Sequence, residues 1–245
     1  MQRVFISDLH LENHESPRFQ RFAECLSAES VWADEIYLLG DLMEMWVGDD
    51  DDTPLARNVT QVLAAAADRA GVFLMHGNRD FLFGDGFALR AHLQLLEDPH
   101  LIDGDVLLSH GDAWCIDDQA YQQMRSMFRS AAWQDDILAK PLDERKALGQ
   151  MLRARSRAEN ANKSSNIMDV NVSAVMQSAA AHNARTLIHG HTHRPGRHEK
   201  DDTRRYVLGS WERCGWLLRQ SGAHFQLECF SLARRYESGT AHPAR

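Results

Sequence analysis

The chain has 245 residues, an apolar fraction of 44% and a formal net charge of −8 at pH 7. This length allows one α/β domain, or one domain with an insertion, to bury a sizeable core. The acidic balance argues against a general nucleic-acid binder, and no apolar run approaches the ~20 residues of a membrane-spanning helix.

Short apolar runs recur along the chain, and each one is followed by side chains that can bind a metal ion. The runs occupy residues 4–6, 36–39, 72–75, 106–108 and 186–188. Runs of this length, bounded by glycine and polar residues, are typical of buried strands. Ligands of open α/β sheets bind beyond the carboxyl ends of the strands. We therefore predict one site at these ends, with Asp41 at its centre as a bridge between two metal ions.

Helical periodicity separates these runs, and it dominates one long segment. From Gln119 to Asn183 there is no strand-like run, and apolar residues recur at helical spacing. We predict a core formed by residues 1–118 and 184–237, a helical insertion or lid at 119–183 and a mobile tail at 238–245. The insertion carries more Lys and Arg than Asp and Glu, whereas the whole chain is acidic. A hairpin over residues 216–230 is predicted to close the core.

Two composition features bear on the environment and on further metal sites. The chain has 4 cysteines without metal-binding spacing, and its first strand begins by Val4. We therefore expect free thiols, no signal peptide and a cytoplasmic protein. The aspartate run 49–52 could bind calcium or form a solvated loop, and the missing EF-hand pattern favours the loop.

The candidate ligands combine carboxylate, carboxamide and imidazole groups and include no thiolate. They are Asp8, His10, Asp41, Asn78, His110, His191 and His193. This mixture suits Mn²⁺, Fe²⁺ or Zn²⁺. On an extended backbone, the Asp8-x-His10 and His191-x-His193 pairs would each direct two side chains the same way. Each pair could then serve both ions or bind a single one.

The ordered motifs D-x-H, G-D, G-N-R-D, S-H-G-D and G-H-T-H resemble those of the calcineurin-like metallophosphoesterase superfamily over nearly the whole chain. The resemblance implies an α/β fold of two packed β-sheets flanked by helices, with two metal ions at the strand ends. It implies that Asp41 bridges the ions. It assigns Asp8, His10 and His193 to the first ion, and Asn78, His110 and His191 to the second.

Arg79 departs from the superfamily pattern. Most members carry histidine after the asparagine of the G-N motif, where it acts as an acid near the leaving group. An arginine does not release its proton, so we predict that Arg79 instead holds phosphate oxygens. We expect Asp41, Arg79 and His191 to act in catalysis.

The Asn78-Arg79-Asp80 motif, the segment 40–44 and the helical insertion together resemble one subfamily. Its members hydrolyse the pyrophosphate of a diacylated UDP-glucosamine in lipid A biosynthesis, with Mn²⁺, at the cytoplasmic face of the bacterial inner membrane. The implied mechanism is attack of a metal-bridged hydroxide on the UMP-side phosphorus, releasing UMP and the acylated sugar 1-phosphate. The implied substrate contacts are Asn78, Arg79, Asp118, Ser156, Asn160, Lys163 and His191. No nucleic-acid partner and no obligate protein partner are inferred.

Several alternatives remain open at this stage. The chain could act on another nucleotide or phosphodiester, or it could be a non-catalytic scaffold of the same fold. Apolar residues of the insertion, such as Met127 and Phe128, could line an acyl-chain groove or form the insertion's own core. His189 neighbours the candidate ligands, and we treat it as a non-ligand.

Overall fold

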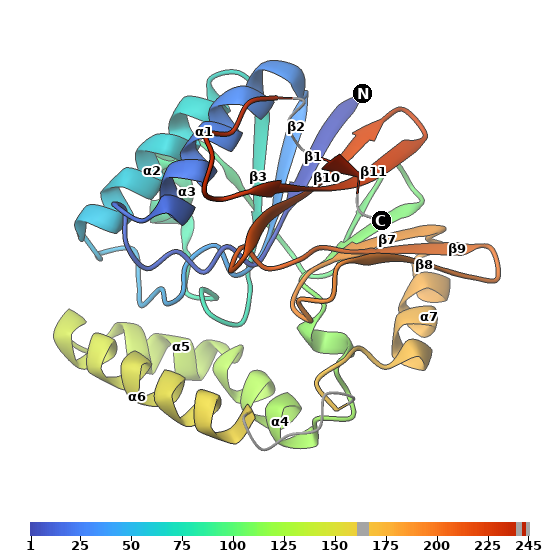
Figure 1. Ribbon diagram of the computed structural model, residues 1–245. Coiled ribbons are helices and arrows are strands. Elements are labelled where there is room, and N and C mark those ends of the chain that lie inside the picture. The colour runs from blue at the N-terminus through green and yellow to red at the C-terminus, as the bar shows by residue number, and fades with distance from the viewer. Residues whose placement is uncertain (161–166, 239–241, 244–245) are drawn as a thin grey trace.

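Two β-sheets pack face to face in the computed structural model, which describes residues 1–160, 167–238 and 242–243 (Figure 1). The 7-stranded sheet has the order β12-β11-β10-β1-β2-β3-β4, and the 5-stranded sheet has the order β5-β6-β7-β9-β8. The strands of the first sheet are β1 (Gln2–Ile6), β2 (Glu35–Leu39), β3 (Gly71–Met75), β4 (Gln94–Leu96), β10 (Cys214–Ser221), β11 (His224–Ser231) and β12 (His242–Pro243). Those of the second are β5 (His100–Ile102), β6 (Val106–Ser109), β7 (Thr186–His189), β8 (Gly196–Lys200) and β9 (Thr203–Val207).

Helices flank both sheets and extend beyond their strand ends. They are α1 (Pro17–Trp32), α2 (Pro54–Ala67), α3 (Asp85–Arg90), α4 (Gln119–Phe128), α5 (Ala131–Leu138), α6 (Leu142–Asn160) and α7 (Val172–Ala181), with a short 3₁₀ turn at Asp112–Trp114. This arrangement confirms the predicted α/β fold of two packed sheets with helices outside. Among the described helices, none is both long and apolar enough to cross a membrane.

The apolar runs are unbroken because the central strands are buried on both faces. Val4 and Ile6 of β1 pack toward the helices, whereas Phe5 between them packs into the layer that joins the two sheets. In the second sheet, Leu107 and Leu108 of β6 divide in the same way between α7 and that layer. Successive side chains of a strand point to opposite faces, so both rows have to be apolar.

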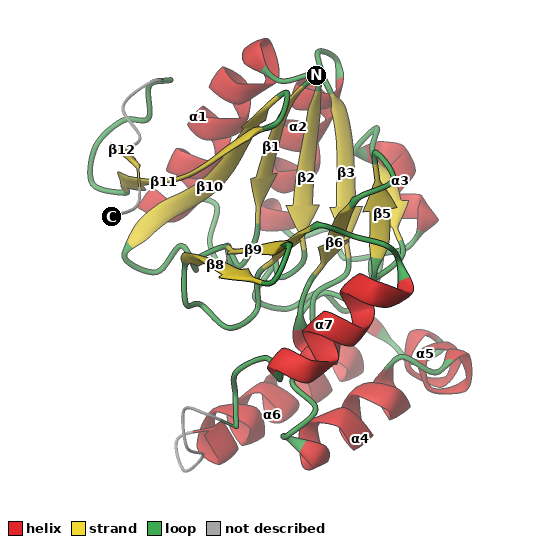
Figure 2. Cartoon of the chain, turned by 90° about the vertical axis from the view of Figure 1, so that its right-hand side faces the viewer, coloured by secondary structure: helices red, strands yellow, loops and turns green. Residues whose placement is uncertain are grey.

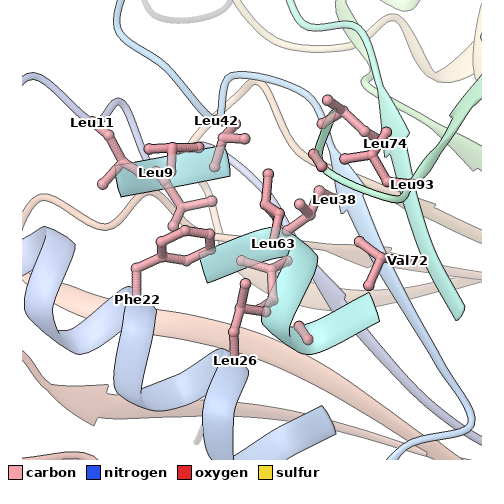
Figure 3. Close-up of a cluster of buried hydrophobic side chains, with 14 of the residues drawn as sticks. Leu9, Leu11, Phe22, Leu26, Leu38, Leu42, Leu63, Val72, Leu74 and Leu93 are labelled. Atoms are coloured by element: carbon pink, nitrogen blue, oxygen red, sulfur yellow. The ribbon is translucent and has the colours of Figure 1, made fainter. Parts of the chain in front are cut away.

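Helices α1 and α2 cover the outer face of the 7-stranded sheet. Figure 3 shows Phe22 and Leu26 of α1 gathered with Leu63 of α2 in this buried layer. Each helix begins where a hydroxyl side chain, Ser16 or Thr53, accepts a hydrogen bond from a backbone N–H of the first turn, and a proline follows. The caps and the apolar stripe together fix the two helices against the sheet.

Parallel pairing brings the ends of the ligand-bearing strands together. β1, β2 and β3 are parallel neighbours in one sheet, and β6 and β7 are parallel in the other. In Figure 2 the arrowheads of β1, β2 and β3 point toward the helices α4 to α7. Three glycines allow the loops beyond these ends to approach closely. A Cβ at Gly77 would overlap Asp41, one at Gly190 would overlap Asp8, and one at Gly40 would overlap Gly77.

The segment predicted as an insertion lies in two places. Helices α4, α5 and α6 group together beyond the strand ends, whereas α7 lies beside the 5-stranded sheet (Figure 1). Val175 and Ala179 of α7 pack with Leu107 and Leu187 on the outer face of that sheet. We therefore use the term lid for α4–α6 alone, and we assign α7 to the core layers.

The aspartate run 49–52 joins the lid to the core. Asp49 accepts hydrogen bonds from backbone N–H groups at the start of α3. Asp50 pairs with Arg145 of α6 at 2.8 Å, and Asp51 pairs with Lys146 at 2.9 Å. The expectation of a solvated loop holds in part, because Asp50 and Asp52 are exposed, whereas Asp49 and Asp51 are partly buried against α3 and the lid.

The C-terminal hairpin is present as predicted, formed by β10 and β11 around Gly222, whose φ is +59°. The tail differs from the prediction in one respect. His242–Pro243 pairs with β11 at Glu228 and Cys229 as the short strand β12. Residues 239–241 and 244–245 of that tail lie outside the described part of the chain.

Candidate metal centre

The predicted ligands converge where the two sheets present their strand ends. Asp8, His10 and His193 place their ligand atoms within 4.8 Å of one another, and so do Asp8, Asp41 and His110. Asp8 is 0% exposed and Asp41 is 2% exposed. The loops after β1, β2, β6 and β7 therefore contribute to one cluster, which is buried at Asp8, Asp41 and His110 and reaches solvent at His193.

The first group surrounds His10 Nε2. That nitrogen lies 3.2 Å from His193 Nε2 and 3.8 Å from Asp41 Oδ2. His193 Nε2 in turn lies 3.4 Å from Asp8 Oδ1. Two carboxylates and two imidazoles thus face a common point, which is the donor set predicted for the first ion.

The second group surrounds Asn78 Oδ1. This oxygen lies 3.0 Å from His110 Nε2 and 2.9 Å from His191 Nδ1. His110 Nε2 lies 3.8 Å from Asp41 Oδ1, and Asp41 Oδ2 lies 3.8 Å from His10 Nε2 and 3.3 Å from the inward atom of the Asn78 amide, so Asp41 stands between the two groups. This geometry supports a bridging role for Asp41. In the opposite amide orientation, the Asn78 nitrogen would donate hydrogen bonds to both imidazoles. A nitrogen that donates cannot bind a cation, so binding of an ion by Asn78 requires the orientation with the oxygen inward.

The charges of the cluster also fit a bound cation. Within the described part of the chain, no lysine or arginine pairs with Asp8 or Asp41, and the basic groups closest to them are histidine imidazoles. Buried carboxylates need compensation by a positive charge. Carboxylate, carboxamide and imidazole together form a donor set suited to divalent transition metals. The residues present therefore fit the two ions that the sequence motifs predict.

The cluster imposes an unusual backbone conformation. Asp8, His10, Asp41, His191 and His193 all have positive φ, between 48° and 66°. The extended backbone assumed for the D-x-H and H-x-H pairs is therefore wrong. His191 and His193 turn to different groups, whereas Asp8 and His10 meet at the same one. Left-handed backbone is strained for residues with a side chain, and such strain is concentrated at functional sites.

Burial and neighbouring charges oppose each other at His110. Burial lowers its pKa, but the carboxylates of Asp41, Asp112 and Asp8 together raise that pKa to about 9. His110 must release this proton before its Nε2 can bind a metal ion, so metal binding competes with protons here.

Asp80 is a buried residue that holds the loops of the metal cluster in place. The sequence pattern assigned no role to this last residue of the G-N-R-D motif. Its carboxylate accepts hydrogen bonds from the backbone N–H groups of Gly77 at 2.9 Å and Met43 at 3.1 Å. It thereby ties the loop after β3 to the loop after β2. Burial and the neighbouring Asp41 carboxylate raise the pKa of Asp80 to about 6.

The proposed substrate-binding residues are only partly within the described chain. Arg79, Asp118 and Ser156 line a pocket of mixed polarity, here called the metal-side pocket, together with ligands from both groups. Asp118 also caps α4 by accepting a hydrogen bond from the Tyr121 N–H at 3.1 Å. The side chain of Asn160 and all of Lys163 lie outside the described residues.

His189 faces away from both groups, which agrees with its treatment as a non-ligand. Its Nε2 accepts a hydrogen bond from Arg205 at 3.1 Å, and its Nδ1 lies 2.9 Å from the carbonyl oxygen of Gly190. Burial and the Arg205 charge lower the pKa of His189 to about 3. It is therefore a neutral support beneath the G-H-T-H loop.

A second pocket, here called the apolar groove, lies between the lid and the loops after β2 and β3. Its walls include Trp46, Phe81, Phe128, Trp133, Leu148 and Leu152. Its empty volume is about 880 Å³, counting open solvent at its mouth. Met127 points elsewhere and is 50% exposed, so only one of the two apolar residues named above lies in this wall.

The two pockets are adjacent and share part of their lining. Both are lined by Asn78, Arg79, Tyr121, Met124 and Ser156. The Tyr121 ring lies over His191, with centroids 5.8 Å apart, and its hydroxyl donates to Asp112 at 2.7 Å. The helical spacing of this segment gave Tyr121 no role in the site. The available signal was a tyrosine in the first turn of the helix, three residues after the capping Asp118.

Two stacked sheets with clustered acids, an asparagine and histidines at their strand ends define a metallophosphoesterase. The family model described as calcineurin-like phosphoesterase matches residues 1–195. The chain belongs to the calcineurin-like phosphoesterase family.

Two relatives of this chain share one name. The chain is 45% identical over 224 residues to a UDP-2,3-diacylglucosamine hydrolase of Chromobacterium violaceum, covering 89% of this chain and 94% of the relative. It is 45% identical over 231 residues to the protein of that name from Aromatoleum aromaticum, covering 91% and 94%. Among solved structures, wild-type Vps29 of Entamoeba histolytica, complexed with zinc, has a TM-score of 0.50 at 13% identity, covering 100% of this chain and 98% of that one. This last similarity concerns the fold alone.

Proposed function

We propose that the chain hydrolyses the pyrophosphate bond of UDP-2,3-diacylglucosamine, giving UMP and 2,3-diacylglucosamine 1-phosphate in lipid A biosynthesis. The observation that carries this proposal is that the metal-side pocket and the apolar groove are adjacent and share lining residues. One ligand can place a pyrophosphate beside the acids and imidazoles and an acyl chain against the lid. The names of the relatives supply the identity of that ligand.

The proposed cofactors are two Mn²⁺ ions. Asp41 would be shared, Asp8, His10 and His193 would hold the first ion, and Asn78, His110 and His191 the second. When bound, such a pair supplies an activated water nucleophile and neutralises charge on phosphoryl oxygens. The protein contributes a preorganised donor set that is buried at most positions and reaches solvent at His193.

Arg79 occupies the junction of the two pockets. We propose that its guanidinium holds the oxygens of the phosphoryl group under attack, at the UMP-side phosphorus. Asn78 and His191 would contribute from the same wall. Asp118 and Ser156 would contact the polar part of the substrate, and Asn160 and Lys163 are proposed for the same role on sequence grounds.

We further propose that the protein binds peripherally at the cytoplasmic face of the inner membrane, where an acylated substrate resides. Arg145 and Lys146 of the lid already pair with the aspartate run, so these two charges do not attract an anionic leaflet. Membrane binding is supported instead by exposed apolar side chains: Met127 is 50%, Leu138 42% and Met151 59% exposed. All three belong to the lid, and apolar side chains of this kind can enter a leaflet surface.

The proposed function is tested by product analysis with acylated UDP-glucosamine and Mn²⁺ in water enriched in ¹⁸O. The expected products are UMP and the acylated sugar 1-phosphate, with the label in UMP. Label in the sugar phosphate would contradict attack at the UMP-side phosphorus. Hydrolysis of simple phosphodiesters, with no preference for the acylated nucleotide sugar, would favour the alternative of a different phosphoesterase.

Removal of metal is expected to abolish this activity, and Mn²⁺ is expected to restore it best. The physical reason is the oxygen- and imidazole-rich donor set, which suits such an ion. The measurement is turnover after dialysis against EDTA and re-addition of Mn²⁺, Mg²⁺, Ca²⁺ or Zn²⁺. Full activity in excess chelator would contradict the metal centre, and an absence of bound metal after supplementation would favour the scaffold alternative.

Replacement of Arg79 by alanine is expected to lower kcat by about 10²–10³-fold, the loss typical of one preorganised donor. Metal content should not change, because a protonated guanidinium has no lone pair to offer a metal ion. The matched variant Arg79→Lys keeps the charge but loses the planar fork of donors, so it should recover only part of the rate. An unaltered kcat at confirmed metal occupancy would show that Arg79 does not touch the phosphoryl group.

A further inference from the structure

The carboxylate of Glu44 lies between a proposed metal ligand and the lid. Its Oε2 is 3.1 Å from Nδ1 of His10, while Nε2 of the same ring faces His193 and Asp41. On its other side Glu44 pairs with Arg153 of α6, which also donates to the Glu44 backbone carbonyl. A line of three side chains thus leads from the lid to the first metal group.

This arrangement has a known physical effect on metal ligands. A histidine that binds through Nε2 keeps its proton on Nδ1, and a carboxylate beside Nδ1 fixes the ring and strengthens it as a ligand. In the described structure, His10 Nδ1 is buried and makes no hydrogen bond, and the carboxylate of Glu44 approaches it at an ion-pair distance of 3.1 Å. Glu44 is therefore the group placed to orient this imidazole.

The position of Glu44 is itself well fixed. Its backbone N–H donates to the carbonyl oxygen of Leu11 at 3.1 Å, which joins the loop after β2 to the loop after β1. Gly149 of α6 packs against Met45, so the lid approaches this loop closely. The Arg153 guanidinium then compensates the Glu44 charge from the lid side.

We propose that Glu44 is a positioning residue for His10, and that Arg153 acts through Glu44, so that docking of the lid strengthens binding of the first ion. The inference rests on the proposed function only through the metal group of Asp8, His10, Asp41 and His193. This proposal assigns a function to Glu44, the last residue of the segment 40–44 that resembles the subfamily. It also makes α6 a contributor to the metal centre as well as a wall of the apolar groove.

Lys146 offers a matched control on the same helix. Its ion pair with Asp51 also joins α6 to the core, at 2.9 Å, and Lys146 lines neither pocket. Loss of that pair removes one lid contact without touching a proposed ligand. The Lys146 variant therefore shows how a weakened lid contact affects metal binding when the Arg153–Glu44–His10 contacts stay intact.

The experiment measures Mn²⁺ binding to the metal-stripped full chain by electron paramagnetic resonance of free Mn²⁺, with circular dichroism as the check of folding. Wild type should bind two ions. Glu44→Ala and Arg153→Met should each weaken one of them about 10–100-fold and leave the other unchanged. Glu44→Gln, which keeps an acceptor oxygen, should lose less, and Lys146→Met should match wild type. In a chain that already carries Glu44→Ala, the additional change Arg153→Met should not weaken Mn²⁺ binding further.

The outcomes separate this inference from the proposed function. A wild-type chain that binds no ion overturns both. Two ions in wild type, with unchanged affinities in Glu44→Ala and Arg153→Met, overturn only the role of Glu44. Equal weakening of both ions, shared by Lys146→Met, would assign the effect to lid docking in general and would also overturn it.

Discussion

Replacement of Asp41 by alanine is expected to abolish turnover while the chain stays folded. One carboxylate oxygen faces His10 and the other faces His110, so the change removes a ligand from both metal groups at once. Two ions together supply several kcal/mol of transition-state stabilisation. The rate should therefore fall by about three orders of magnitude or more. Steady-state rates at saturating Mn²⁺, with metal content measured, provide the test.

Asp41→Asn is the better-matched variant, because Asp41 has a φ of 54° and asparagine tolerates this conformation far better than alanine. It keeps the shape of the side chain and removes only the charge. His10→Ala should instead remove one ion and leave the second bound. A substantial rate in Asp41→Asn with both ions retained would show that Asp41 is not the bridge.

The second large effect concerns the acyl chains. UDP-glucosamine without acyl chains is expected to react with a kcat/KM lower by about two orders of magnitude or more. Each buried methylene contributes ~0.8 kcal/mol, so four buried methylenes already account for ~3 kcal/mol, or about two hundredfold. A lid that only excludes water predicts similar rates for both substrates. Equal rates would remove the lipid from the proposal and leave a metal-dependent pyrophosphatase.

Two variants of α4 test whether the preference for acylated substrate arises in the apolar groove. Phe128 lines the apolar groove, whereas its neighbour Met127 does not line it and is half exposed. Phe128→Asp should therefore reduce kcat/KM for the acylated substrate and spare the substrate without acyl chains. Met127→Asp places the same charge one residue away and should leave both rates in solution unchanged. Equal losses in the two variants would indicate damage to the lid rather than to a groove.

The sequence predicted the layers of the fold and the convergence of the ligands for a simple reason. Strands buried on both faces require uninterrupted apolar runs, as in 36–39, and these are visible without a structure. Parallel order then places the following residues, such as Asp41 and Asn78, at the same edge. The strands can thus be recognised from local sequence patterns, and the position of the site follows from the rule that ligands bind at the carboxyl ends of parallel strands.

The parts that could not be predicted depend on pairs of residues distant in sequence. The aspartate run had two interpretations because its partners, Arg145 and Lys146, lie almost a hundred residues further along the chain. α7 has the same helical spacing as the lid, and only its packing on Leu107 and Leu187 assigns it to the core. Similarly, no local pattern could show that Glu44 lies beside His10.

The left-handed backbone at five of the proposed ligands has a consequence for how this protein balances stability against activity. Each such residue costs the folded state on the order of 1 kcal/mol or more, a substantial share when several occur together. Glycine at Asp8, His10 or His193 would relieve that cost and would remove a ligand. The sequence that is optimal for the metal centre is therefore not the sequence that is optimal for folding. A stabilised form of this chain should accordingly be sought by changes in the sheets and helices, with these five positions left as they are.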